Sequence, residues 1–236
     1  WVAVSVVIAI LSHLLRALRW EQLLDAMNYR PGTLRTLSAV LIGYFANFLV
    51  PRLGEVSRCG SLKKTADIPF EESFGTVITE RIVDLLSLVV LIGITFLFEW
   101  EPLQKSLFPT LQLPSGAFIL TASLLGLIGL GVLWKCRDFL QNIGLESKLG
   151  QMILGWIAGI GSIRHLAQPG KFIAYSIGIW LCYYLSTYTL FLAFPISENL
   201  GMNAALTILV MGTFGMATPT QGGIGAYHSL VASAFV

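Results

Sequence analysis

The sequence predicts an all-α fold: a polytopic helical membrane protein with two inverted re-entrant hairpins. Composition is the first reason. Of the 236 residues, 55% are hydrophobic and only 12% are charged, and the mean hydropathy is +0.75, which is more apolar than a soluble core of this size requires. A second reason is the alternation of apolar segments with short basic stretches. A third is a Gly/Pro interruption that occurs in both halves of the chain, a pattern typical of broken helices around a transporter's substrate site.

Segment length separates full membrane spans from half spans. The apolar segments cover 1–15, 36–50, 73–98, 117–134, 171–194 and 204–218. About 20 residues are needed to cross the ~30 Å hydrocarbon core, so 36–50 and 204–218, each ended by Pro and Gly, are expected to be half-membrane helices. Apolar residues at helical spacing in 148–167 predict a helix at the interface or, alternatively, a short span. Both ends of the sequence lie in apolar stretches, so we expect a fragment truncated at both ends.

Basic residues orient these segments, because cytoplasmic loops carry an excess of Lys and Arg. By this criterion 16–35, 51–72 and 135–171 are predicted to be cytoplasmic, whereas 99–116 and 195–203 are predicted to be external. The segment between the first two cytoplasmic stretches must then enter and turn back. Three full spans separate the two Gly/Pro interruptions, so the second hairpin enters from the opposite side. We therefore expect one transmembrane domain over 1–236, with inverted repeat halves at about 36–98 and 171–236.

One face of segment 73–98 is polar. Ser73, Thr76, Glu80, Asp84 and Ser87 recur at helical spacing, and Arg81 borders them. Charged side chains inside a membrane usually face a cavity or a partner, so Glu80, Arg81 and Asp84 are candidate substrate-binding residues. The alternative is that Glu80 and Arg81 extend to the cytoplasmic interface.

The first hairpin places Arg52, Glu55 and Arg58 just after its break. At a spacing of three residues they are expected to share a face of the return helix, where arginine can bind a phosphate through two parallel hydrogen bonds. Asn47, just before the break, is a further candidate. The alternative is a solvated cytoplasmic loop.

The second hairpin carries no acidic or basic residue except His228, which is a further candidate. Its predicted site residues are Thr220, Gln221, Gly222, Gly223 and Gly225. Backbone amides at the start of a helix favour an anion. The glycines fit equally well with a tight turn or a close helix crossing.

Several function classes are not supported by the sequence. The formal charge of +2 is too small to indicate nucleic-acid binding. The sequence contains no motif typical of hydrolases, nucleotide-binding loops or zinc sites, so we predict no catalytic residue, no metal and no cofactor. Whether the chain is an enzyme stays open, with a non-enzyme favoured, because distant residues can still form a catalytic site.

Three blocks of residues resemble the lysylphosphatidylglycerol synthase transmembrane-region family. They are Gly43 to Glu55 with Arg58, Glu80 to Asp84, and Pro219 to Gly225, and the resemblance extends over nearly the whole chain. The family includes the membrane half of the multiple peptide resistance factor, which is associated with moving aminoacylated phospholipid between leaflets. Family members often have an acidic residue shortly after the last glycine of the third block, where this chain has Ala226-Tyr227-His228.

Together with the residues, the resemblance implies a flippase-like lipid transporter of the cell inner membrane. Its expected partner is a phospholipid or a polyprenyl-linked lipid with an anionic or zwitterionic headgroup, and a soluble lipid-modifying enzyme is a further expected partner. One alternative is a membrane enzyme, or a subunit of one, that acts on a lipid-linked substrate in aminoacyl- or glycosyl-lipid synthesis. A second alternative is a membrane scaffold that transports nothing.

Overall fold

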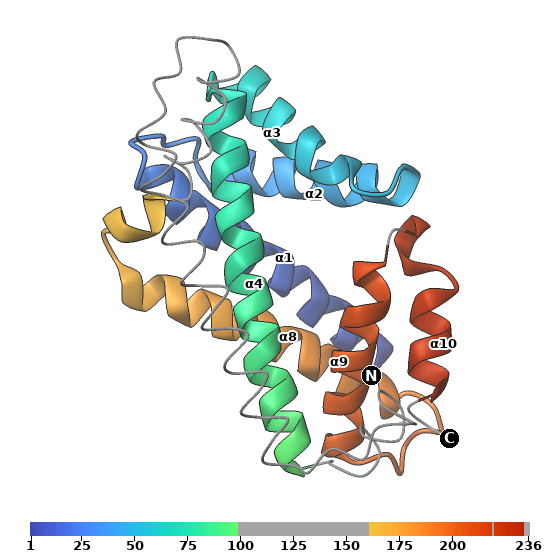
Figure 1. Cartoon of the computed structure of the whole chain (residues 1–236). Coiled ribbons are helices and arrows are strands. Elements are labelled where there is room, and N and C mark those ends of the chain that lie inside the picture. Colours follow the sequence, from blue (N-terminus) through green and yellow to red (C-terminus); the bar gives the residue numbers. More distant parts are fainter. Residues whose placement is uncertain (99–160, 219, 234–236) are drawn as a thin grey trace. The chain divides into compact units, whose positions relative to one another are not determined.

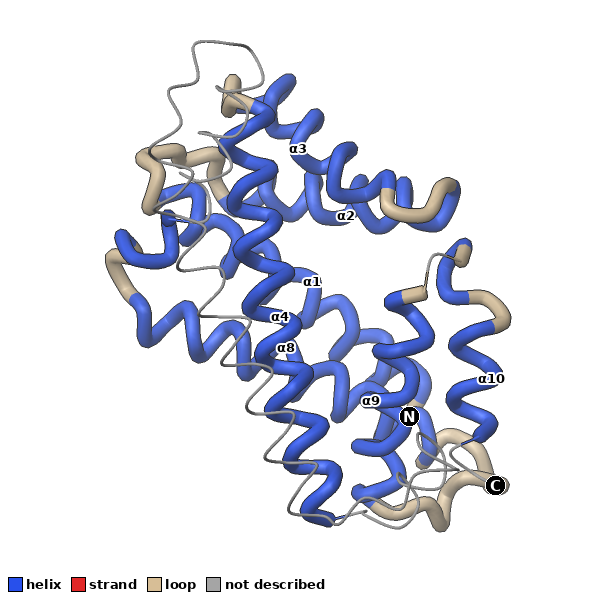
Figure 2. The backbone as a smooth tube through the Cα atoms, in the orientation of Figure 1, coloured by secondary structure: helices blue, strands red, loops and turns tan. Residues whose placement is uncertain are grey.

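Helices form all the regular structure in the part of the chain that the computed structural model describes, residues 1–98, 161–218 and 220–233 (Figures 1 and 2). The elements are α1 (Val2–Asp25), α2 (Thr33–Leu49), α3 (Leu53–Ala66), α4 (Phe70–Phe98), the 3-10 turn η1 (Ser162–His165), α8 (Pro169–Phe191), α9 (Met202–Ala217), the 3-10 turn η2 (Gln221–Gly223) and α10 (Ala226–Ser233). The predicted helical class is confirmed for these residues. The predicted span 117–134, the predicted loop 99–116 and most of the predicted interfacial helix lie outside them.

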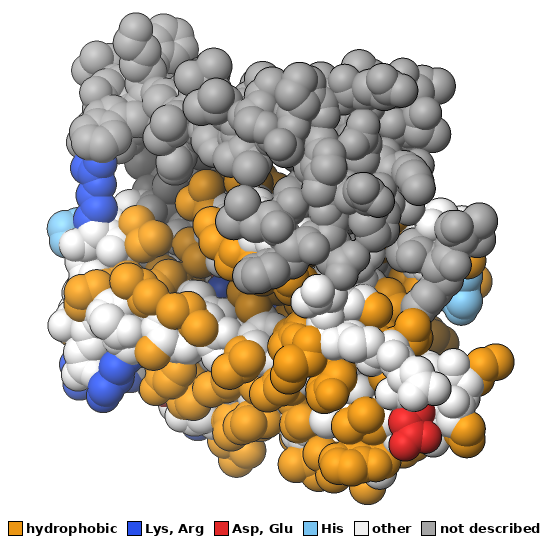
Figure 3. Space-filling view, turned by 90° about the horizontal axis from the view of Figure 1, so that it is seen from below, with side chains coloured by type: hydrophobic (Ala, Val, Ile, Leu, Met, Phe, Trp, Pro, Cys, Tyr) orange, Lys and Arg blue, Asp and Glu red, His pale blue; other side chains and the backbone are white. Residues whose placement is uncertain are grey.

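The described surface is strongly apolar. Hydrophobic side chains make up most of the described part of the face in Figure 3. Within the described ranges, α1 is the one helix that is both long and apolar enough to cross a membrane, with a hydropathy of 1.8, while α2 and α9 are shorter apolar helices. The short lengths of α2 and α9 agree with the lengths expected from the sequence.

Helix α1 is longer than the predicted apolar segment 1–15. It continues to Asp25, so Arg16 and Arg19 lie in a helix and not in a loop, which corrects the assignment of 16–35 as a loop. Residues 17–25 include no Gly or Pro and are mostly good helix formers. A turn follows α1, and in it Asn28 has a left-handed φ of 66°. The prediction that this stretch is cytoplasmic therefore depends on its two other basic residues, Arg30 and Arg35.

Two compact units divide the described chain. Unit A consists of residues 13–85 and 161–179, and unit B consists of residues 1–12, 86–98, 180–218 and 220–233. Helices α1, α4 and α8 each contribute to both units.

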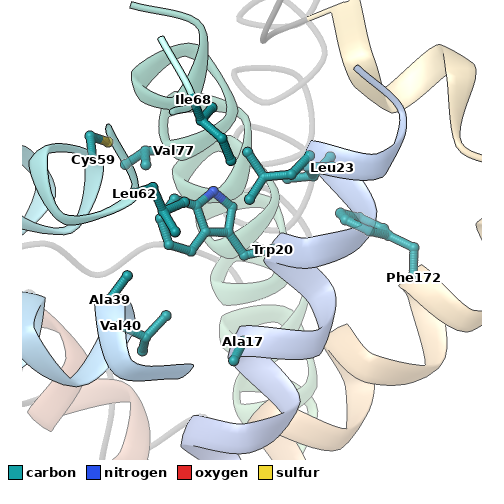
Figure 4. Packing of buried hydrophobic residues seen from close by; sticks show 11 residues of the cluster. Ala17, Trp20, Leu23, Ala39, Val40, Cys59, Leu62, Ile68, Val77 and Phe172 are labelled. Carbon is teal, nitrogen blue, oxygen red and sulfur yellow. The ribbon is translucent and has the colours of Figure 1, made fainter. Parts of the chain in front are cut away.

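The core of unit A surrounds Trp20 (Figure 4). Its buried residues come from five helices and the segment before α4: Ala17, Trp20, Leu23, Leu24, Ala39, Val40, Cys59, Leu62, Ile68, Val77 and Phe172. Burying a large side chain of this kind contributes about 1.5–3 kcal/mol, so this core fixes α1, α2, α3 and α4 against one another. A polar layer lies directly beside it, because the Trp20 indole Nε1 donates a hydrogen bond to Thr76 Oγ1 at 2.8 Å.

Unit B is held by a smaller apolar cluster and by hydroxyl contacts. Phe191, Ala205 and Ile208 are its buried members. The N-terminal part of α1 contacts α8 through Ser5 and Ser186, whose hydroxyl oxygens lie 2.9 Å apart. Small hydroxyl residues of this kind let apolar helices approach closely.

Candidate functional site

Five charged side chains of unit A meet in its interior, and we call them the ionic cluster: Arg16 and Arg19 of α1, Arg58 of α3, and Glu80 and Asp84 of α4. Arg16 donates to Glu80 Oε1 at 2.6 Å and to Asp84 Oδ2 at 3.0 Å. Arg19 donates to Asp84 Oδ1 at 2.7 Å, and Arg58 donates to Glu80 Oε2 at 2.7 Å. The cluster thus joins three helices through charge-assisted hydrogen bonds, the strong class.

The ionic cluster is almost fully removed from solvent. Glu80 is completely buried, Arg19 is too, and Asp84 has the most exposed side chain of the five at 14%. Glu80 therefore does not extend to an interface, and that alternative for this residue is wrong. Moving charges out of water costs several kcal/mol for each ion, and removing one partner from a buried pair is strongly destabilising. Such a cluster persists only where every charge has partners or where the site has a function.

Arg58 is fixed on two sides. Its guanidinium lies over the Trp20 ring, 4.5 Å from the ring centroid, while its Nη2 binds Glu80. A cation over a desolvated indole is stabilised by about 2 kcal/mol. Trp20 is itself held by its hydrogen bond to Thr76, so the Arg58 guanidinium has little freedom to move.

A second and weaker ion pair lies at the edge of the cluster. Arg81 Nε donates to Glu55 Oε1 at 3.1 Å, and the two side chains are 48% and 28% exposed. Arg81 also lies 3.9 Å from Asp84. This outer pair connects α3 to α4 next to the buried charges.

A small cavity of about 20 Å³ lies between α1, α2, α3 and α4, beside the ionic cluster and the outer pair. Its lining residues are Arg16, Val40, Gly43, Tyr44, Asn47, Gly54, Glu55, Arg58 and Arg81. This volume holds about one water molecule. Charged groups of both the ionic cluster and the outer pair reach the cavity, so it is the candidate binding site.

Positive charge exceeds negative charge around the cavity. The ionic cluster and the outer pair together contain four arginines and three carboxylates. The Nε groups of Arg19 and Arg58 are buried and donate no hydrogen bond to any described residue. The site therefore has spare donors and an excess of one positive charge, which favours an anionic ligand.

The α2–α3 hairpin is closed by a glycine contact. A Cβ on Gly54 would overlap the Gly43 carbonyl oxygen and would lie 2.6 Å from the Asn47 side chain. The Gly54 amide donates to Asn47 Oδ1 at 2.7 Å. Asn47, a predicted site candidate, thus joins the two helices and also lines the cavity.

Arg52 does not share a helix face with Glu55 and Arg58. It precedes the first residue of α3, takes a left-handed φ of 65° and is exposed at the turn. The predicted common face is wrong for this residue because α3 begins only at Leu53. Glu55 and Arg58, by contrast, both reach the cavity.

The second hairpin, α9 with α10, is also closed by glycines. Cβ atoms on Gly212 and Gly215 would lie 2.7 and 2.5 Å from atoms of Tyr227. Gly223 and Gly225 have left-handed φ values of 74° and 87°, which ordinary residues rarely adopt. This geometry agrees with the tight-turn alternative that the sequence left open.

Other predicted residues of the second hairpin lie around this turn in unit B. Thr220 is exposed, with its hydroxyl 3.2 Å from that of Thr218, and Gln221 begins η2, which also contains Gly222. His228 is exposed and its ring packs edge-on against Tyr227.

Arg16 and Arg19 were missed as site residues. A signal was present, because Ser5, Ser12, Arg16 and Arg19 recur at helical spacing and are all buried. Counting these arginines as loop charges hid that pattern. No group of three or more His, Cys, Asp or Glu side chains with the arrangement of metal ligands occurs in the described ranges.

Comparison with known proteins identifies the family. The sequence profile described as "Lysylphosphatidylglycerol synthase TM region" matches residues 1–236. The chain belongs to this family. The resemblance found in the sequence is therefore confirmed, and this lysylphosphatidylglycerol synthase TM region chain is a membrane protein by family.

Three proteins are similar to parts of this family member. Glycosyltransferase AglD of Haloferax volcanii is 31% identical over 94 residues, which are 39% of this chain and 15% of AglD. UPF0104 membrane protein PH1989 of Pyrococcus horikoshii is 28% identical over 102 residues, 42% of this chain and 30% of the relative. UPF0104 membrane protein MJ1595 of Methanocaldococcus jannaschii is 29% identical over 87 residues, 36% of this chain and 26% of the relative. Each alignment thus covers less than a third of the relative, and no solved structure matches the chain.

Proposed function

We propose that the chain is a multi-pass, flippase-like lipid transporter of the cell inner membrane, which moves a phospholipid or lipid-linked headgroup through a polar site within the bilayer. The observation that carries this proposal is the arginine-rich cavity beside the buried ionic cluster. In membrane proteins, ionisable residues inside the bilayer usually mark the pathway of a substrate or an ion. An excess of positive charge suits a phosphate group.

The apolar turn of the first hairpin supports a re-entrant position in the membrane. Phe48 is 66% exposed, and Leu49, Val50 and Leu53 around the same turn are also exposed. A turn in water is usually rich in polar residues, and at this one Arg52 is the exposed charge. We propose that this hairpin and α9–α10 enter the membrane from opposite sides, as the basic residues in the sequence predict.

In this proposal, each site residue has a role in binding the lipid headgroup. Arg58 and Arg81 bind the phosphate, Arg16 lines the same cavity, and Arg19 adds positive charge to the ionic cluster beside it. Glu80 and Asp84 hold the arginines in position, and they provide negative charge for a cationic headgroup. Glu55 likewise holds Arg81 in the empty site or accepts a cationic headgroup. The remaining residues keep the binding roles that the sequence predicts for them: Arg52 at the first turn, Asn47 at the cavity, and the second-hairpin residues Thr220, Gln221, Gly222, Gly223, Gly225 and His228.

Translocation of fluorescent phosphatidylglycerol in proteoliposomes tests the proposal. The full-length protein is expected to speed translocation, and Arg81→Ala is expected to lower the rate about 10- to 100-fold, since a hydrogen bond to a charged group contributes about 1.5–3 kcal/mol. Arg30→Ala is the matched control, because Arg30 forms a single exposed ion pair with Asp25. Equal rates for wild type and Arg81→Ala would remove this residue from the site, and no translocation by folded wild type would reject transport of this lipid.

A second candidate function is an enzyme, or a subunit of one, that acts on a lipid-linked substrate. The similarity of one segment to a protein named a glycosyltransferase favours it. Mass spectrometry of the lipids recovered from the same vesicles separates the two proposals. A chemically changed lipid supports the enzyme, whereas unchanged lipid in the opposite leaflet supports transport. If neither occurs, and substitutions in the ionic cluster change only stability, the scaffold alternative gains support.

A further inference from the structure

The outer ion pair differs from the other ion pairs around the cavity. Glu55 and Arg81 make one contact of 3.1 Å with both side chains partly exposed, whereas the buried pairs of Glu80 are as short as 2.6 Å. Exposed pairs contribute about 0–1 kcal/mol, far less than it costs to break a buried pair. The contact between Glu55 and Arg81 is therefore weaker than the buried ion pairs of Glu80 beside it.

The outer pair is also a part of the cavity wall that can move, because both of its side chains are partly exposed. The cavity of about 20 Å³ has room for about one water molecule and is too small for a phosphate group. Its back is rigid, because Arg58 is held between Trp20 and Glu80. Backbone contact between Gly43 and Gly54 closes another side. Only partly exposed side chains such as Glu55 and Arg81 can move aside at low cost.

We propose that the Glu55 carboxylate is an internal placeholder for the phosphate of the lipid. It binds Arg81, and an incoming phosphate takes over this arginine, releases Glu55 towards solvent and widens the cavity. The inference rests on the proposed lipid-binding function and names both the ligand group and the residue that competes with it. A carboxylate and a phosphate oxygen are equivalent acceptors for an arginine fork, and the excess of positive charge around the cavity is what attracts the anion.

The test is binding by the purified full-length protein in detergent at low ionic strength. The probes are fluorescent phosphatidylglycerol and fluorescent diacylglycerol, which lacks the phosphate, and unlabelled inorganic phosphate is the competitor. Glu55→Gln keeps the shape of the side chain and removes its charge. It is expected to lower the Kd for phosphatidylglycerol about two- to fivefold, the range that a partly exposed ion pair can supply, with no change for diacylglycerol.

Asp25→Asn is the matched control. The Asp25 carboxylate forms a single 2.8 Å contact with Arg30 and does not line the cavity. The substitution removes the same unit of charge from an exposed pair, and it is expected to leave both affinities unchanged. Glu55→Ala serves as a second variant with the same expectation, and thermal unfolding checks that each variant is folded.

Three results would overturn the placeholder and leave lipid binding intact: unchanged or weaker phosphatidylglycerol binding by folded Glu55 variants, an equal gain for diacylglycerol, or an equal gain in Asp25→Asn. A wild type that binds the two lipids equally would reject both the placeholder and the proposed function. If inorganic phosphate at millimolar concentration displaces the lipid from wild type, and does so more strongly from Glu55→Gln, the phosphate alone is sufficient for recognition. If it displaces neither, while Glu55→Gln still gains affinity, the placeholder acts on the phosphate of an intact lipid.

Discussion

Replacing Glu80 by Gln should destabilise the protein more than any other single loss of charge at the site. Glu80 is fully buried and pairs with Arg16 at 2.6 Å, Arg58 at 2.7 Å and Arg19 at 3.3 Å. The substitution keeps the size of the side chain. It leaves Asp84 as the carboxylate of the ionic cluster that pairs with Arg16 and Arg19, and it removes the ion pair of Arg58. Breaking buried ion pairs costs about 3–5 kcal/mol. For a chain of this length that corresponds to a decrease in Tm of about 6–20 °C.

Thermal unfolding of the full-length protein in detergent measures the effect, with Glu55→Gln as the matched control. Glu55 is partly exposed and makes a single contact, so its loss should cost at most about 1 kcal/mol. Adding Arg58→Met to Glu80→Gln removes an unpaired positive charge and should recover part of the lost stability. A Glu80→Gln variant that melts within about 2 °C of wild type would show that the ionic cluster does not stabilise the fold as a buried network.

Two further predictions concern packing around the cavity, and both are read from Tm. Gly54→Ala should destabilise the α2–α3 hairpin by about 1–3 kcal/mol, because its Cβ would overlap the backbone of Gly43. Gly60→Ala in the same helix has open space and should stabilise by up to about 1 kcal/mol, so equal effects of the two changes would contradict this packing. Trp20→Phe should lower the free energy of unfolding by about 1–3 kcal/mol. The substitution leaves the Thr76 hydroxyl without its indole donor and weakens the contact with Arg58. An unchanged Tm would show that neither contact stabilises the fold.

The hairpins and the polar face of α4 could be predicted because their signals are local. A Gly/Pro break marks the end of α2, and helical spacing predicts that Ser73, Thr76 and Glu80 share a face, which the structure shows to be buried. The length of the apolar segments, with the Pro and Gly that end them, also indicated short helices at 36–50 and 204–218, close to the observed α2 and α9.

The partners of α4 could not be predicted, because they depend on contacts between residues distant in sequence. Arg16 and Glu80 are 64 residues apart, and positive charge next to an apolar segment fits a loop as well as a buried helix. Arg52 shows the opposite case, since its spacing from Glu55 suggested a shared face that the left-handed turn removes. Local patterns predict which face of a helix is polar, but only tertiary packing decides which charge lies opposite it.

Translocation of phosphatidylglycerol by wild type and by Arg58→Gln shows whether the arginine-rich cavity carries lipid transport. Arg58 is buried, lines the cavity and contacts Glu80 and Trp20, so it connects the ionic cluster to the proposed binding site. Rates in proteoliposomes are compared per amount of folded protein, with Asp25→Asn as the control. We expect translocation by wild type and by Asp25→Asn, and a loss of about tenfold or more in folded Arg58→Gln. Equal translocation by folded Arg58→Gln and wild type would contradict it.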